Sequence, residues 1–192
     1  MRFPRATHLV CAFEKQEDAQ RFYEVLGKRL GKFGLELSAE KTRIIEFSST
    51  DRPGKTSFDF LGFEFRWGKD RAGKPRVMCR TSRKKLRSSL KSFNEWCKKN
   101  RHKRLAELFK TLNAKLRGYF NYYGVIGNYV SLQLFFDKAI RMLFRHLNQR
   151  SQRRSYNWNG FHQLIEQFGI VKPHIVERPK RRNVMSLKPE TA

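Results

Sequence analysis

Three successive stretches after Thr81 repeat their apolar residues at the spacing of helix turns, and this periodicity constrains the fold more than any other feature. The first stretch has one apolar face, formed by Leu86, Leu90, Phe93 and Cys97. Ser82 is placed to cap this first helix. Further helices are expected over residues 103–119 and 128–147, with a short fourth helix over residues 159–168. The short joints predict a small three-helix antiparallel bundle.

The first 80 residues have a mixed pattern instead. Residues 9–13 and 42–47 are apolar runs typical of strands, and residues 14–30 between them have helical spacing. Residues 58–67 alternate aromatic and polar side chains, which predicts one further strand with a hairpin return. Gly62 within it indicates close approach of another backbone or a ligand. The predicted class is therefore α+β: a small partial sheet with one helix and a hairpin, followed by the helical bundle.

Positive charge is concentrated in the helical part. Residues 80–154 contain 20 Lys and Arg against three acids, which leaves +17 of the chain's net charge of +25 in this segment. Hydrophobic residues make up 39% of the chain, enough for a core, so a fully disordered basic protein is not expected. A folded cation of this kind favours a nucleic-acid partner. A ribosomal-type or merely cationic protein is the alternative.

The first predicted helix carries much of this charge. Cationic residues that fall outside its apolar stripe include Arg83, Lys84, Arg87, Lys91 and Lys98. An ordinary solvated face would mix Glu with Lys at i, i+4 spacing, and acids are almost missing here. RNA phosphates bind such a face through Coulomb attraction and counterion release. Arg80, just before the helix, is included in this predicted RNA-binding surface.

Residues 116–124 combine aromatic residues with Arg117, Asn121 and two glycines. Unpaired RNA bases can stack on tyrosine, so Arg117 and Tyr122 are predicted RNA contacts. Packing into the end of the bundle is the alternative for the neighbouring rings, Tyr119, Phe120 and Tyr123. Residues 150–158 have no buried-helix pattern and predict a basic loop. Its predicted RNA contacts are Arg150, Arg153, Arg154 and Tyr156.

Other classes of protein and site are not indicated. No apolar run approaches the ~18 residues of a membrane span. The three cysteines are Cys11, Cys79 and Cys97, and their odd number and wide spacing argue against both a disulfide framework and a zinc knuckle. The histidines are scattered, so no metal or cofactor is predicted. A reducing cytoplasm suits this cysteine usage.

Several motifs, in order, resemble group II intron reverse transcriptases with maturase activity. Residues 34–42 are similar to the palm segment after the catalytic loop, and residues 60–65 to the hairpin near the primer end. Residues 116–124 resemble the signature of the maturase-specific domain, and residues 147–156 the family's next basic block. The resemblance covers residues 9–177 and identifies the chain as a C-terminal fragment of this family.

The resemblance implies three regions. They are a truncated palm remnant at 1–80, a maturase-specific region (thumb, or domain X) at 81–170, and a basic extended tail at 171–192. In the family, the thumb holds the intron RNA and the primer–template duplex, and the protein helps the intron to fold for splicing. The expected function is therefore binding of structured group II intron RNA with assistance to its splicing.

One departure from the family concerns the polymerase site. Two aspartates precede the strand that corresponds to residues 9–13 in the family, and with a third they hold Mg²⁺; here the two positions are Thr7 and His8. Neither side chain replaces a carboxylate ligand for Mg²⁺. No catalytic residue, no metal and no polymerase activity of the chain alone are expected. A degraded gene read from an internal start is one hypothesis for residues 1–8.

Two alternatives stay open from the sequence. The chain could complete an RNA-directed DNA polymerase together with a separately encoded fingers–palm polypeptide. It could also be a pseudogene product, in which the expected strands at 9–13, 44–47 and 60–65 would be exposed edges prone to aggregation.

Overall fold

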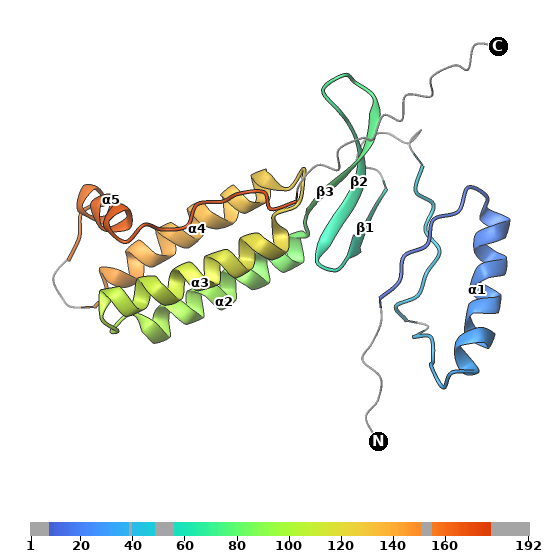
Figure 1. Cartoon of the computed structure of the whole chain (residues 1–192), viewed down its shortest axis with the longest axis horizontal. Coiled ribbons are helices and arrows are strands. Elements are labelled where there is room, and N and C mark those ends of the chain that lie inside the picture. Colours follow the sequence, from blue (N-terminus) through green and yellow to red (C-terminus); the bar gives the residue numbers. More distant parts are fainter. Residues whose placement is uncertain (1–7, 39, 49–55, 151–154, 178–192) are drawn as a thin grey trace, which may run out of the picture. The chain divides into compact units, whose positions relative to one another are not determined.

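The structure, a computed structural model, describes residues 8–38, 40–48, 56–150 and 155–177 (Figure 1). These residues form five helices and a three-stranded sheet, so the predicted α+β class is confirmed. The chain divides into two compact units. One unit contains Met1–Leu61 and Arg66–Arg76, and the other contains Gly62–Phe65 and Val77–Ala192.

Helix α1 (Gln16–Gly31) is the helix of the first unit and confirms the helix predicted over residues 14–30. Acidic residues lie in its first turn and basic residues in its last, where each sign of charge complements the helix dipole. None of its residues is buried. Its apolar side chains are therefore not packed into a core by the described residues.

The apolar runs on either side of α1 are not strands. Residues 9–13 and 42–47 belong to no sheet among the described residues, so the prediction of strands there is wrong. An extended apolar run becomes a strand only where a neighbour completes its hydrogen bonds. Phe47 packs instead against the rings of Phe58 and Trp67, at centroid distances of 5.1 and 5.4 Å. Its carbonyl oxygen accepts a hydrogen bond from Trp67 Nε1 at 3.3 Å.

The sheet has the strand order β1-β2-β3. The strands are β1 (Ser57–Phe60), β2 (Phe63–Lys69) and β3 (Pro75–Thr81). The single strand predicted over residues 58–67 is wrong, because the chain turns at Leu61 and Gly62. Their φ angles are 49° and 84°, and two consecutive positive φ angles are typical of a tight hairpin turn. The predicted return strand is confirmed as β3.

The second unit is built on three helices that lie side by side in Figure 1. They are α2 (Arg83–Asn100), α3 (Leu105–Tyr123) and α4 (Tyr129–Leu147). Each short joint reverses the chain, so α2 and α4 run in the same direction and α3 runs against both. The predicted antiparallel bundle is therefore confirmed. Helix α5 (Trp158–Gln167), the predicted fourth helix, follows α4.

The facing sides of these helices form one hydrophobic core. Its largest fully buried side chains include Phe109, Phe120, Phe161, Leu112, Leu116, Leu132 and Leu143. The chain after α5 returns along α3 (Figure 1). Asn113 binds it there, since its Oδ1 accepts from Val171 N at 2.9 Å. Further along, Val176 N donates to Gly124 O at 2.8 Å, so this segment is fixed to α3 near both ends.

Candidate nucleic-acid interface

Helix α2 presents the cationic face predicted from the sequence. Ser82 caps it, since its Oγ accepts a hydrogen bond from Lys85 N at 3.4 Å. Leu90, Phe93 and Cys97 point into the core. The predicted cations outside this buried stripe are exposed: Arg83, Lys84, Arg87, Lys91 and Lys98. The sequence places them at helical spacing, and the buried stripe turns them all toward solvent.

These five cations are not neutralised by ion pairs within the described part of the chain. No carboxylate there forms an ion pair with any of them. The acid on the same helix is Glu95, which is also exposed. Unpaired cations on a rigid helix repel one another, and a polyanion relieves that repulsion. The face is therefore suited to phosphates, which bind by charge without regard to base identity.

Arg80 differs from the α2 cations because an acid holds it. Its Nη2 lies 2.6 Å from Glu64 Oε1, and its Nε donates to Glu64 Oε2 at 3.0 Å. A two-pronged pair of this kind fixes both side chains and neutralises much of the charge. This pair connects β3 to the start of β2. An RNA phosphate would have to compete with Glu64 for Arg80, so the predicted RNA contact of Arg80 stays a prediction.

The aromatic segment belongs mainly to the core. Helix α3 continues to Tyr123, one turn beyond the predicted end at residue 119. Phe120 is fully buried, and Tyr119 stacks on Phe135 with ring centroids 3.8 Å apart. Burial raises the pKa of Tyr119 and of Tyr123 above the ordinary value. Tyr119, Phe120 and Tyr123 therefore pack into the end of the bundle, which was the alternative to stacking with RNA bases for these three rings.

Tyr122 is the ring of this segment that faces solvent, with 54% of its surface exposed. It stacks on Phe63 at a centroid distance of 6.0 Å and an interplanar angle of 14°. Gly62 makes room nearby, since an added Cβ would lie 3.1 Å from Tyr123 Oη; the atoms nearest that position belong to side chains, not to the backbone or ligand predicted there. Arg117 is also exposed. A solvent-facing tyrosine suits stacking by an unpaired base.

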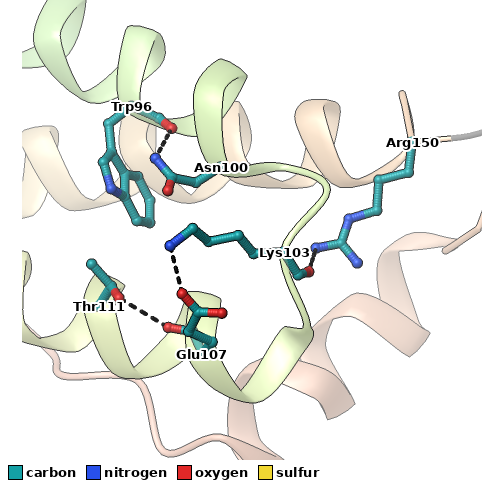
Figure 2. Close-up of polar contacts among 6 residues, drawn as sticks. All are labelled: Trp96, Asn100, Lys103, Glu107, Thr111 and Arg150. Atoms are coloured by element: carbon teal, nitrogen blue, oxygen red, sulfur yellow. Dashed lines mark hydrogen bonds and ion pairs between the residues drawn. The ribbon is translucent and has the colours of Figure 1, made fainter.

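Arg150 has a structural contact that the sequence did not indicate (Figure 2). Its Nη2 donates to the carbonyl oxygen of Lys103 at 3.0 Å and so ties the end of α4 to the α2–α3 joint. The ammonium of Lys103 pairs with Glu107 across the first turn of α3. Asn100 Nδ2 donates to Trp96 O at 2.8 Å and helps to end α2. Burial lowers the pKa of Arg150, and the hydrogen bond to Lys103 O leaves its guanidinium only partly free for an RNA phosphate.

Of the remaining predicted RNA contacts, the structure describes Tyr156 but not the two arginines. Arg153 and Arg154 lie outside the described residues, as does the tail from residue 178 onward. Tyr156 is half-buried and packs against the core, and its backbone N donates to Asn148 Oδ1 at 2.8 Å. Its ring therefore has a packing role beside any role toward RNA.

Asn128 positions the α2 face and was missed by the sequence reasoning. It is fully buried, and its Oδ1 accepts from Thr81 N at 2.7 Å. Its Nδ2 donates to Thr81 Oγ1 and to Tyr123 O, both at 2.8 Å. The residue just before Ser82 is thereby fixed to the α3–α4 joint. A lone Asn before a helix reads as a cap, and nothing in its spacing indicates a buried partner 47 residues away.

The cysteines offer little chemistry. Burial raises the pKa of Cys97 to about 12 and that of Cys79 to about 11, so both thiols stay protonated and unreactive. Cys97 is a buried small hydrophobe, as predicted.

Within residues 8–38, 40–48, 56–150 and 155–177, no group of three metal-ligating side chains gathers. No helix in that part of the chain is long and apolar enough to cross a bilayer.

Comparison with known protein families gives a match for the helical part of the chain. Residues 79–164 match the family described as group II intron, maturase-specific domain. The matched region starts in β3 and ends in α5, and it contains the whole of α2, α3 and α4. No curated protein and no solved structure matches the chain.

Proposed function

We propose that this chain, whose residues 79–164 belong to the group II intron maturase-specific family, binds group II intron RNA and assists its splicing through the exposed face of α2. The family match associates the chain with group II introns. The observation that carries the proposal further is the cationic face of α2, which lies inside the matched region and has no ion pair among the described residues.

Several features support a rigid phosphate-binding surface. Leu90, Phe93 and Cys97 anchor α2 in the core, and Ser82 caps its start. A binding surface that is already ordered loses little conformational entropy when RNA arrives. The exposed Tyr122, supported by Phe63, adds a stacking surface for an unpaired base. Charge would supply affinity, and shape together with stacking would supply preference for the intron.

A triple substitution on α2 tests this proposal. Arg83→Gln, Arg87→Gln and Lys91→Gln remove three exposed charges without touching the core. If each contacts a phosphate, the slope of log affinity against log salt should fall by about three. The matched control replaces three exposed cations at the C-terminal end of α1 with Gln, at Lys28, Arg29 and the C-cap Lys32. Equal slopes in the two variants would remove α2 from the RNA interface.

A splicing assay extends the test from binding to assistance. The α2 variant should lower the yield of spliced product from a group II intron precursor at limiting protein, because fewer intron molecules are held in the bound state. The α1 variant should leave the yield unchanged. Full assistance by an α2 variant that no longer binds RNA would contradict the proposed role.

Polymerase activity of the chain alone is not part of the proposed function. Thr7 and His8 stand where the family has carboxylates, and neither is a good Mg²⁺ ligand. Primer extension with Mg²⁺ should give no product from the isolated chain. Extension by the chain together with an added fingers–palm polypeptide would favour the polymerase alternative instead.

A further inference from the structure

A second basic surface lies on α4 and consists of residues that the sequence reasoning did not single out. Lys138, Arg141, Met142 and Arg145 line a shallow depression of about 230 Å³. Their spacing of three, four and seven residues puts them on one side of the helix. All three cations are exposed. The depression therefore has a positive rim, with Met142 as its apolar lining residue.

Arg145 is positioned from the neighbouring helix. Its Nη2 donates to Asn94 Oδ1 of α2 at 3.4 Å. The same oxygen lies 2.9 Å from Nε2 of His146, and because a carbonyl oxygen only accepts, Nε2 carries the proton. Asn94 thus receives two donors from adjacent residues of α4. This arrangement restrains the guanidinium at one end of the depression.

Further cations lie close to this point. Burial lowers the pKa of His146, and the charges of Arg145, Arg101 and Lys98 lower it further. The ring is therefore neutral near pH 7 and is buried beside three permanent charges. Lys98 and Arg101 come from the C-terminal end of α2. Positive potential consequently extends from the α4 depression to that end of α2.

No carboxylate in the described part of the chain forms an ion pair with the rim. Asp137 adjoins Lys138 in sequence, but its Oδ1 accepts a hydrogen bond from Gln133 Nε2 at 2.9 Å. Lys138, Arg141 and Arg145 form no ion pair with any described acid. Such an uncompensated set on a folded surface is suited to an anion with several charges.

We infer that the α4 depression binds the sugar–phosphate backbone of RNA, as a second contact beside the Lys98 end of the cationic face of α2. Phosphate oxygens match the planar donor forks of Arg141 and Arg145, and Lys138 adds a point charge. Met142 offers an apolar surface against which a ribose can lie. The inference rests on the proposed function for the identity of its ligand, and it adds a second point at which the RNA is held.

The test replaces Lys138, Arg141 and Arg145 with Gln in the full chain. Binding to a group II intron RNA should weaken by about tenfold or more near 0.15 M salt, and the salt slope should fall by about two to three. The matched control is the α1 variant Lys28→Gln, Arg29→Gln and Lys32→Gln, which loses the same charge. Thermal unfolding should change little in both variants, since all six side chains are exposed and Arg145 loses one long hydrogen bond to Asn94.

The outcomes separate this inference from the proposed function. If the unaltered chain does not prefer intron RNA over generic duplex, the proposed function fails. If it does prefer intron RNA but the α4 and α1 variants have the same slope and affinity, only the α4 inference fails. Poly-glutamate serves as a probe for an acidic protein segment. If the α4 variant loses binding to poly-glutamate but still binds RNA, the depression binds acidic protein instead, and the inference is overturned.

Discussion

The segment around α1 and the α2–α5 bundle have similar amphipathic patterns, but only the bundle buries its apolar residues. In α1 no residue is buried, and Val25, for example, is 56% exposed. In α3 the equivalent apolar residues Leu108, Leu112 and Leu116 are at most 1% exposed. Helical periodicity therefore specifies the helix and its apolar side, whereas burial depends on a second surface to cover that side.

The difference has an energetic consequence. Most of the stability of a helix in a protein comes from packing of its apolar face rather than from intrinsic propensity. The bundle should therefore hold nearly all of the chain's cooperative unfolding free energy. The α1 segment should open at much lower cost, and substitutions in the two regions should differ accordingly.

The largest expected contrast comes from shortening one apolar side chain in each region. Leu112→Ala, at a fully buried position of α3, should cost about 2–5 kcal/mol of unfolding free energy because it leaves a cavity. Val25→Ala in α1 should change it by less than about 0.5 kcal/mol. Urea unfolding followed by circular dichroism measures both. Similar costs for the two substitutions would mean that α1 has a packed core.

A second contrast concerns buried polar groups. Asn128→Ala should cost about 2–4 kcal/mol, because three hydrogen bonds are lost and the backbone groups of Thr81 and Tyr123 stay buried without them. Asn121→Ala, on the exposed side of α3, is the control and should have little effect. An Asn128 variant as stable as the control would show that the bundle tolerates loss of this connection.

Two glycines with positive φ give a smaller contrast. Gly62, with a φ of 84°, would place an added Cβ 3.1 Å from Tyr123 Oη, whereas Gly73, with a φ of 78°, has no atom within 4 Å of that position. Both Ala variants should lose about 1–2 kcal/mol of unfolding free energy, because alanine is strained at a positive φ. Gly62→Ala should lose about 1 kcal/mol more through crowding. Equal unfolding midpoints would indicate that Tyr123 moves aside freely.

The smallest expected effect is a pH dependence from His146. Its pKa lies below the ordinary value of 6.5, so the unfolded chain binds the proton more readily than the folded chain. The corresponding stability is present above about pH 6.5 and decreases as the pH falls below that value. Urea midpoints at pH 7.5 and 5.5 should therefore differ less in His146→Gln than in the unaltered chain. Identical pH dependence in both would exclude His146 as the source.

The sequence predicted the bundle well because its signals are local. Ser82 as a cap and the stripe of Leu90, Phe93 and Cys97 each depend on residues within a few turns. The strands predicted at 9–13 and 42–47 failed because a strand needs a pairing partner, which a single apolar run does not specify. The tight turn at Leu61 and Gly62 was hidden inside an alternating aromatic pattern.

The candidate interface was predictable to a similar extent. The exposed cations of α2 follow from helical spacing alone. The contact of Arg150 with the Lys103 carbonyl and the pairing of Arg80 with Glu64 do not, because each depends on how distant segments meet. Asn94 was missed for the same reason, since its role toward Arg145 exists only after α2 and α4 pack. The RNA contacts of these residues stay predictions.

The most direct test of the central claim is a salt titration of the full chain binding to a structured group II intron RNA, with generic duplex RNA of equal length as competitor. If the bundle presents a maturase surface, the intron RNA should win by about tenfold or more near 0.15 M salt, because shape and stacking add to charge. If both RNAs bind alike and binding disappears as salt rises, the net charge of +25 alone accounts for the affinity, and the proposed function is contradicted.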